Sequence, residues 1–120
     1  MNIELRSIVE RGNLAKERLT LRVLVDTDVG NFVVFRTGRD GDSVTTGVSE
    51  TFWFPYQRVN KGDLVVLYTK SGSTLSKPLS TGKVAHFFYW GLSSPIWSDD
   101  NASVVLLHAP EWEGKPSANF

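Results

Sequence analysis

Apolar and polar residues alternate along most of the chain, which is the pattern of half-buried β-strands. Ile3, Leu5, Ser7 and Val9 fall on one face of the first such run, with charged residues between them. Residues 19–26 alternate in the same way. The polar turn at residues 26–31 then precedes another extended run, from Phe32 to Arg36, and this arrangement predicts a hairpin. No segment shows a convincing helical period, so the pattern predicts an all-β protein.

The later runs predict where strands lie relative to the core. Thr51–Phe54 is aromatic and ends at Pro55, and Ser103–His108 is predicted as the last strand. Residues 64–69 are apolar on both faces, which favours a central strand covered on each side. Glycine and polar residues at 37–43, and Ser, Thr, Gly, Lys and Pro at 70–83, predict exposed loops.

Two tryptophans bracket the connection before the last strand. Trp90 and Trp97 flank a Gly, Ser and Pro segment that leads into an acidic turn. In a sandwich of two sheets, inward positions must fill a core about 10 Å thick, and an indole ring does so while its N–H finds a loop carbonyl. We therefore expect both rings between the sheets, in a domain of residues 1–110. Residues 111–120 are predicted to form a loose tail from which Trp112 can fold back.

Five short segments match the pattern of a known family: Thr51–Pro55, Val59–Thr69, Tyr89–Gly91, Ser94–Asp100 and Val104–Leu107. Through these segments, with the strands placed in this way, the chain resembles the lamin tail domain family. The resemblance implies an all-β, two-sheet antiparallel immunoglobulin-like sandwich of about seven to nine strands. It also implies a binding or scaffolding role without a catalytic signature, since the domain in lamins serves interactions with proteins and chromatin. The amino-terminal third departs from the family pattern, and Asn101-Ala102 replaces an expected Gly-Asp pair.

Composition narrows the possible functions. The 120 residues include 13 basic and 13 acidic side chains, so the formal net charge is zero and the chain lacks the overall positive field of a duplex-DNA binder. Cysteine is absent, which excludes disulfides and thiolate metal sites. The amino terminus does not resemble a secretory signal, and no apolar run is long enough to cross a bilayer. These features predict a cytoplasmic protein with no membrane partner.

Few residues suggest catalysis or metal binding. Asp26, Asp28 and Gly30 share features with a calcium loop, but the remaining ligand positions are missing and Asp before Gly is typical of turns. His86 and His108 could share a zinc ion or relay a proton if they lay on neighbouring strands, although a hydrogen-bonded structural histidine is the commoner outcome. Because nucleophile and phosphate-loop motifs are also absent, we predict a non-enzymatic protein without a cofactor.

Aromatic and basic residues supply the candidate ligand-binding set. Trp53, Tyr56, Arg58 and Trp90 could stack on nucleic-acid bases or on sugar rings, with Lys70, Lys77 and Lys83 as further cations for nucleic acid. The main expectation is nonetheless an interaction module that binds a protein partner or a second copy, including by pairing at an exposed edge strand. The alternative is a PUA-like or sandwich module that binds nucleic acid or carbohydrate through its exposed aromatics.

Overall fold

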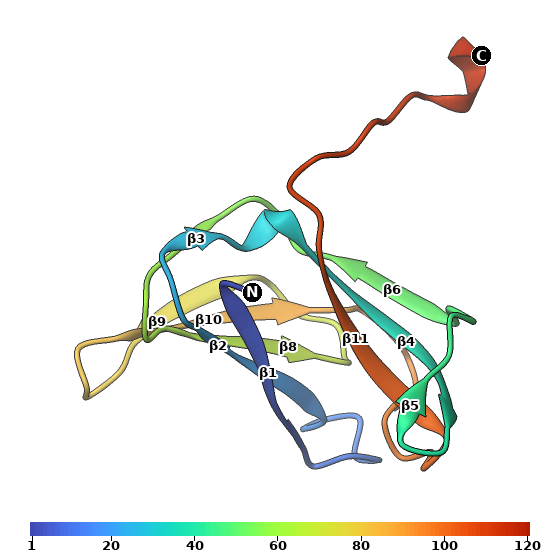
Figure 1. The fold of residues 1–120 in the computed structure, drawn as a ribbon. Coiled ribbons are helices and arrows are strands. Elements are labelled where there is room, and N and C mark those ends of the chain that lie inside the picture. The colour runs from blue at the N-terminus through green and yellow to red at the C-terminus, as the bar shows by residue number, and fades with distance from the viewer.

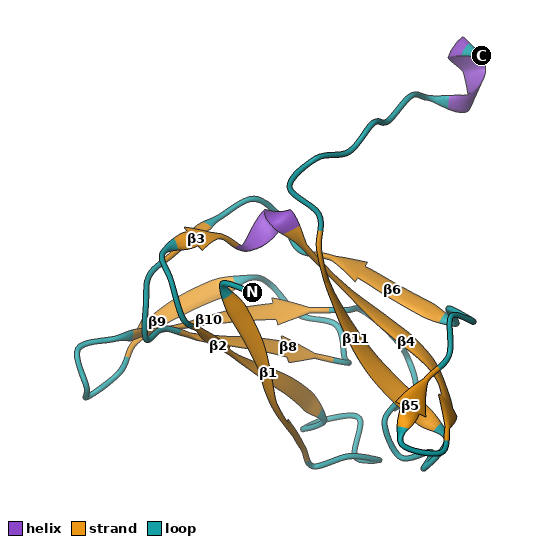
Figure 2. Cartoon of the chain, viewed as in Figure 1, coloured by secondary structure: helices purple, strands orange, loops and turns teal.

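The computed structural model describes all 120 residues and is built almost entirely of β-strands (Figures 1 and 2). One sheet has five strands in the order β1-β2-β8-β10-β9, and a second contains β4 between β11 and β6, with β5 also paired to β4. A short ribbon of β3 and β7 lies beside them. The strands are β1 (Ile3–Val9), β2 (Arg18–Val23), β3 (Thr27–Asp28), β4 (Phe32–Asp40), β5 (Ser43–Val44), β6 (Glu50–Trp53), β7 (Arg58–Val59), β8 (Leu64–Tyr68), β9 (Leu75–Pro78), β10 (Val84–Tyr89) and β11 (Ala102–His108), with 3-10 turns η1 (Val29–Asn31) and η2 (Ser117–Asn119).

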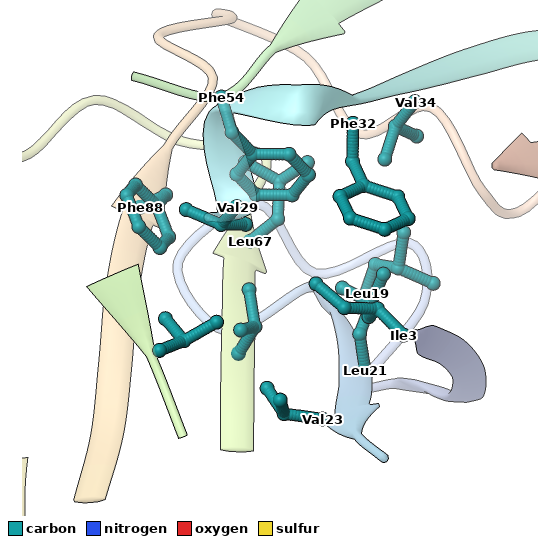
Figure 3. Packing of buried hydrophobic residues seen from close by; sticks show 12 residues of the cluster. Ile3, Leu19, Leu21, Val23, Val29, Phe32, Val34, Phe54, Leu67 and Phe88 are labelled. Atoms are coloured by element: carbon teal, nitrogen blue, oxygen red, sulfur yellow. The ribbon is translucent and has the colours of Figure 1, made fainter. Parts of the chain in front are cut away.

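The hydrophobic core lies between the two larger sheets (Figure 3). Alternate residues of β2, β8 and β10 meet residues of β4, and Phe54 closes one end of the cluster. The ring of Phe54 makes edge-to-face contacts with Phe52 and Phe88, both at 5.1 Å between centroids. The expected all-β sandwich is therefore confirmed at this level. The buried cluster comprises Ile3, Leu19, Leu21, Val23, Val29, Phe32, Val34, Phe54, Val59, Val65, Leu67 and Phe88.

The two tryptophans lie where the sequence predicts. Trp97 is buried, and Trp90 packs against the core cluster. Their ring centroids are 6.2 Å apart, and Trp90 also contacts Phe52 at 5.7 Å. Because β10 belongs to one sheet and β11 to the other, the connection that carries these rings crosses between sheets, and its indoles fill the space at the crossing.

The five-stranded sheet confirms one strand prediction and departs from another. β8 lies in the middle of the sheet, as its two apolar faces indicate. However, β8 and β10 run parallel, whereas the sequence predicted antiparallel pairing throughout. The reason is β9, which occupies part of the expected loop at 70–83 and pairs with β10 on the outer edge. All four β9 side chains are exposed, so this strand has no hydrophobic pattern to reveal it.

A β-bulge in the first strand changes which of its side chains face the core, so the predicted alternation is wrong beyond Leu5. The register between β1 and β2 shifts between Leu5 and Ser7, leaving Arg6 as an extra residue. Since one extra residue reverses the alternation, Ile8 packs against the core beyond the bulge. Ser7 and Val9, which strict alternation places with Ile3, lie instead on the outer face opposite Thr20 and Arg18.

Two predicted loops are also corrected. The run at residues 19–26 and the run from Phe32 do not form a hairpin, because β2 and β4 belong to different sheets. Residues 24–31 cross between the sheets instead, and Asp28 caps η1 by accepting a hydrogen bond from the Gly30 N–H. The predicted loop at 37–43 is shorter than expected, since β4 continues to Asp40 before a tight turn at Gly41.

The chain after β11 leaves the body of the sandwich and ends in η2 (Figure 1). Trp112 nevertheless contacts the body, since its ring lies 5.0 Å from that of Trp53 and its indole N–H donates to the Tyr56 hydroxyl at 2.9 Å. None of the helical turns has the length and apolar character needed to span a bilayer.

Candidate functional site

Of the four predicted ligand-binding residues, Trp53 and Tyr56 form an exposed aromatic group. They are 47% and 58% exposed, and the Trp53 indole N–H donates to the Gly30 carbonyl at 2.8 Å. Arg58 is exposed on β7. Trp90 is not brought together with Trp53: it contacts Phe52, the neighbour of Trp53 in β6, and successive strand residues point to opposite faces.

The outer face of the second sheet continues this group as an apolar surface, which we call the β11 face. Its register places Val105 opposite Phe35, and Leu107 opposite Val33. Val33 also faces Trp53 on the other side of β4. Leu107 is 42% exposed, and charged side chains are absent from this set. A hollow of about 210 Å³ extends the face over Val44 and Val48 of the segment after β4. The β11 face comprises Val33, Phe35, Val44, Val48, Trp53, Val105 and Leu107.

The same sheet ends in an open edge at β11. This strand pairs with β4 over seven residues without a register shift, and no strand pairs with its other side. Residues 102–108 contain neither Lys, Arg, Asp, Glu nor Pro. The other edges carry such residues or are very short: β1 has Glu4, Arg6 and its bulge, β9 has Lys77 and Pro78, β6 has Glu50, and β5 has only two residues. Charges, proline and bulges are the usual means of preventing edge pairing, so β11 is the unprotected edge of the molecule.

The hydrogen-bond pattern shows which groups of β11 are free. The Ala109 N–H donates to the Asn31 carbonyl, which continues the antiparallel ladder by one residue. Since hydrogen bonding to one neighbour alternates along an antiparallel strand, Val104, Leu106 and His108 direct their N–H and C=O groups away from β4. These three residues therefore present a row of unpaired backbone donors and acceptors.

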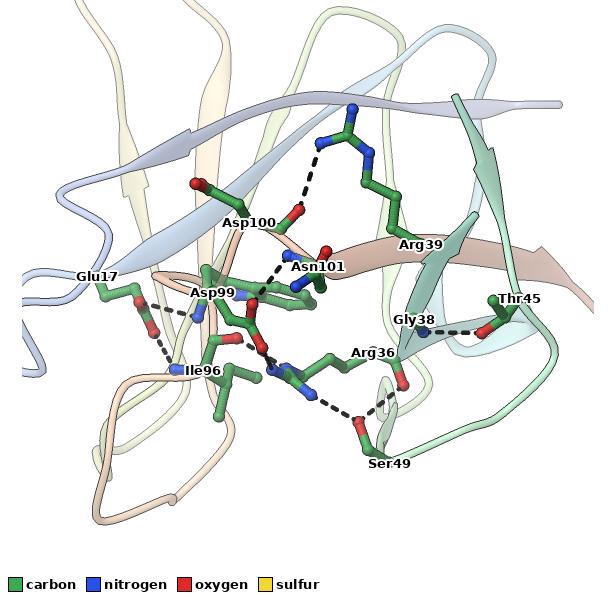
Figure 4. Close-up of polar contacts among 11 residues, drawn as sticks. Glu17, Arg36, Gly38, Arg39, Thr45, Ser49, Ile96, Asp99, Asp100 and Asn101 are labelled. Atoms are coloured by element: carbon green, nitrogen blue, oxygen red, sulfur yellow. Dashed lines mark hydrogen bonds and ion pairs between the residues drawn. The ribbon is translucent and has the colours of Figure 1, made fainter. Parts of the chain in front are cut away.

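Two clamps hold the segment that leads into β11 (Figure 4). From the first sheet, the buried Glu17 carboxylate accepts hydrogen bonds from the N–H groups of Ile96 and Trp97 at 3.0 and 3.2 Å. From β4, the Arg36 guanidinium donates to the Ile96 carbonyl at 2.8 Å and pairs with Asp99 at 3.6 Å. Neither role could be predicted from the sequence, because both contacts link residues 60 or more positions apart.

Glu17 also ties down the ends of two other segments. Its carboxylate accepts from the Gly12 N–H at 2.9 Å and from the Thr69 hydroxyl at 2.5 Å. Burial raises the pKa of Glu17, but these four hydrogen bonds outweigh burial, so its pKa lies below the ordinary value. The residue is thus an ionised structural acceptor.

A second buried carboxylate organises the edge near β9. Asp63 accepts from the His86 ring Nε2 at 2.9 Å and from the Val84 N–H at 3.0 Å. The His86 Nδ1 lies 2.9 Å from both the Gln57 amide and the Ser76 hydroxyl. Burial raises the pKa of Asp63, yet its hydrogen bonds, chiefly that from His86, lower it overall. This network pins β9, β10 and the loop before β7 together.

The candidate metal residues have structural partners. Asp28 accepts from the N–H groups of Gly30 and Gln57, and Asp26 accepts from the Lys61 N–H at 2.7 Å. The two histidines belong to different sheets, since His86 is on β10 and His108 stacks on Phe32 with centroids 4.6 Å apart. Residues 26–31, predicted as a turn, contain β3 and η1 and belong to the connection between the sheets, and the two histidines do not form one site.

Comparison with known proteins adds no further assignment. No protein-family model matches the chain, and no curated protein matches it significantly.

Proposed function

We propose that this chain is a non-enzymatic interaction module that joins a second copy of itself through the open edge of β11. The observation that supports this proposal is the unprotected edge: seven residues in regular register, unpaired on one side, without a charge, proline or bulge. A long, flat and apolar edge of this kind exposes backbone groups that favour pairing with another strand.

The pattern of free groups fits a two-fold contact. When β11 pairs antiparallel with its copy about Leu106, the outward-facing backbone of Val104 meets that of His108 in the copy. The same register sets Val105 opposite Leu107 on the β11 face, so two apolar side chains meet across the contact. Each contact occurs twice because a two-fold interface is self-complementary. Pairing two uncharged strands also brings no like charges together.

The β11 face gives the contact its hydrophobic component. Leu107 and Trp53 remain about half exposed, although both are large apolar side chains. A contiguous apolar surface on a folded domain is typical of a protein-binding site, and its burial contributes about 25 cal/mol per Å². Pairing at β11 would extend the apolar surface across both copies.

The fold assignment behind this proposal stays that of the lamin tail domain resemblance. The segments that carry it include β8, at the centre of the first sheet, and the Trp90–Trp97 crossing into β11. We propose an immunoglobulin-like arrangement of the sandwich on that basis. An experimental structure, superposed on lamin tail domains strand by strand, is the direct test.

Self-association is tested by sedimentation velocity over a concentration series of the full chain. We expect a monomer–dimer equilibrium, and slower amide hydrogen exchange at Val104, Leu106 and His108 in the dimer than in dilute monomer. Leu107→Lys, which places a charge on the edge without removing a core side chain, is expected to shift the chain to monomer. Val25→Lys provides the control, because Val25 is 52% exposed and lies outside β11.

A chain that stays monomeric at millimolar concentration refutes the proposal. So does a dimer that Leu107→Lys leaves unchanged, or one in which the three outward amides exchange as fast as in the monomer. Thermal unfolding of each variant shows that loss of the dimer does not reflect loss of the fold.

A further inference from the structure

The outer face of the five-stranded sheet, on the opposite side of the molecule from the β11 face, carries a row of aromatic rings. Tyr68 pairs in register with Tyr89, and Phe87 is two residues before Tyr89 on the same face of β10. The rings of Tyr68 and Tyr89 are 5.3 Å apart and nearly parallel, and that of Phe87 is 6.4 Å from Tyr68. All three are partly exposed.

Two cations lie directly on this aromatic row. The Arg18 guanidinium is 5.7 Å from the centre of the Tyr68 ring, and the Lys70 ammonium is 5.0 Å from it. Neither forms an ion pair with a carboxylate. The row therefore combines flat apolar rings with positive charges that have no acidic partner.

Three shallow hollows extend this surface across the sheet. The largest, of about 590 Å³, is lined by residues that include Arg6, Arg18, Tyr68 and Phe87. A second, of about 240 Å³, shares Tyr68 and Phe87 and adds Lys77. The third, of about 350 Å³, shares Arg6 with the first and is also lined by Arg22 and Lys83. Together these residues form a continuous surface that we call the aromatic-basic face.

Several basic side chains gather on this face of a chain whose net charge is zero. The aromatic-basic face has six cations, Arg6, Arg18, Arg22, Lys70, Lys77 and Lys83, and none of them is in an ion pair. The exposed carboxylate of Glu4, on β1, lies opposite Arg22. By contrast, the cations of β4 are neutralised locally: Arg36 pairs with Asp99, and Arg39 with Asp42. The net charge of zero thus conceals a positive face, which the composition alone did not reveal.

We propose that the aromatic-basic face binds single-stranded nucleic acid. The six unpaired cations can contact phosphates. The bases of a single strand can stack on the tyrosine and phenylalanine rings, whereas the bases of a duplex are already stacked on one another. The proposal does not depend on pairing at β11, because the two surfaces belong to different sheets. It uses aromatic residues other than Trp53 and Tyr56, which lie on the other side of the sandwich.

The test measures fluorescence anisotropy of labelled dT12 and rU12 with the full chain at 50 mM salt. Phe87→Leu and Tyr68→Leu keep an apolar side chain but remove the stacking ring, and each is expected to weaken binding about tenfold. The double variant Arg18→Gln with Lys70→Gln should weaken binding and reduce the slope of log affinity against log salt by about 1.4, since each phosphate contact contributes about 0.7.

Matched controls come from the other aromatic group. Trp112→Leu removes an exposed ring that packs against that group, and Arg58→Gln removes an exposed cation, both away from the aromatic-basic face. Neither is expected to change the affinity by more than about twofold. Far-ultraviolet circular dichroism and the urea midpoint establish that every variant is folded.

Three results overturn the proposal. The first is no binding of either oligonucleotide at 50 mM salt. The second is a combined result: a twelve-base-pair duplex binds as tightly as dT12, and Phe87→Leu and Tyr68→Leu each bind with unchanged affinity. That result indicates adsorption of any polyanion. The third is loss of binding in Trp112→Leu or Arg58→Gln while the tyrosine and phenylalanine variants bind normally.

Discussion

Replacing Glu17 by glutamine tests whether the buried carboxylate holds the sandwich together. The two oxygens of Glu17 accept four hydrogen bonds: Oε1 from the N–H groups of Gly12 and Trp97, and Oε2 from the Thr69 hydroxyl and the Ile96 N–H. An amide offers one accepting oxygen and one donating nitrogen. If the amide oxygen takes the place of Oε1, the amide nitrogen takes the place of Oε2. The Thr69 hydroxyl can rotate and accept a hydrogen bond from that nitrogen, but the Ile96 N–H can only donate and loses its acceptor.

The expected cost follows from that single mismatch. The Ile96 N–H loses a hydrogen bond to a charged acceptor, a loss of about 1.5–3 kcal/mol, and the buried donor left without a partner costs about 1–3 kcal/mol more. We therefore expect Glu17→Gln to lower the free energy of unfolding by about 2.5–6 kcal/mol. Domains of this size are stable by only about 5–15 kcal/mol, so the loss is a large part of the total.

Urea denaturation followed by tryptophan fluorescence and by circular dichroism measures this loss at neutral pH. Thr69→Val provides a graded comparison: it removes one donor and leaves the carboxylate, so about 1 kcal/mol is expected. Glu4→Gln is the control, because Glu4 is exposed on β1, and its effect should stay within about 0.5 kcal/mol. If the free energy of unfolding of Glu17→Gln is less than about 1 kcal/mol below that of the wild type, and the urea slope is unchanged, this account of the network is refuted.

Three further predictions concern acid stability, a close backbone contact and the core. The pKa values of Glu17 and Asp63 are lowered below their ordinary values of 4.5 and 3.8. The two carboxylates therefore contribute fully to the free energy of unfolding above these values, and this contribution is lost as the pH falls through their pKa values in the folded state. The urea midpoint should decline below about pH 4.5, and Asp63→Asn should flatten the lower part of that decline. If the midpoint holds constant down to pH 2.5, the carboxylates are not the cause. Gly30→Ala places a methyl group 2.7 Å from the Tyr56 Cα, so we expect a lower melting temperature and a changed tryptophan emission near Trp53; an unchanged melt contradicts that contact. Trp97→Ala should cost about 3–5 kcal/mol in urea, as expected for a large side chain only 3% exposed, and a cost below 1 kcal/mol means that the ring does not fill the core.

Strand identity was largely predictable, whereas strand neighbours were not. The predicted central position of β8 follows from its apolar residues on both faces, and burial at Trp97 follows from its place in a strand-to-strand crossing. β9 could not be predicted, since its side chains are all exposed and its pairing is made by backbone groups. The bulge at Arg6 was also hidden, because one extra residue leaves the local composition unchanged but reverses which side chains face the core.

The candidate sites show the same division. The sequence named Trp53 and Tyr56 as candidate ligand-binding aromatics, but their exposure was decided only by the fold. The apolar strand at 103–108 was recognised as the last strand of the fold. That this strand is an unprotected edge depends on which strand lies beside it. Three cations of the aromatic-basic face, Lys70, Lys77 and Lys83, were candidates from the sequence. The face as a whole was not predicted, because Arg6, Arg18 and Arg22 lie on β1 and β2 and join those lysines only after folding.

The sequence by itself determined the all-β class, the central apolar strand and the tryptophans that fill the crossing between sheets, because side-chain alternation and burial are local properties of a strand. Only the tertiary structure decided the parallel pair of β8 and β10, the open edge at β11, the Glu17 clamp and the separation of charge into one positive face. Each of these depends on contacts between residues far apart in the chain, and their energies come from backbone pairing and electrostatics that no local pattern encodes.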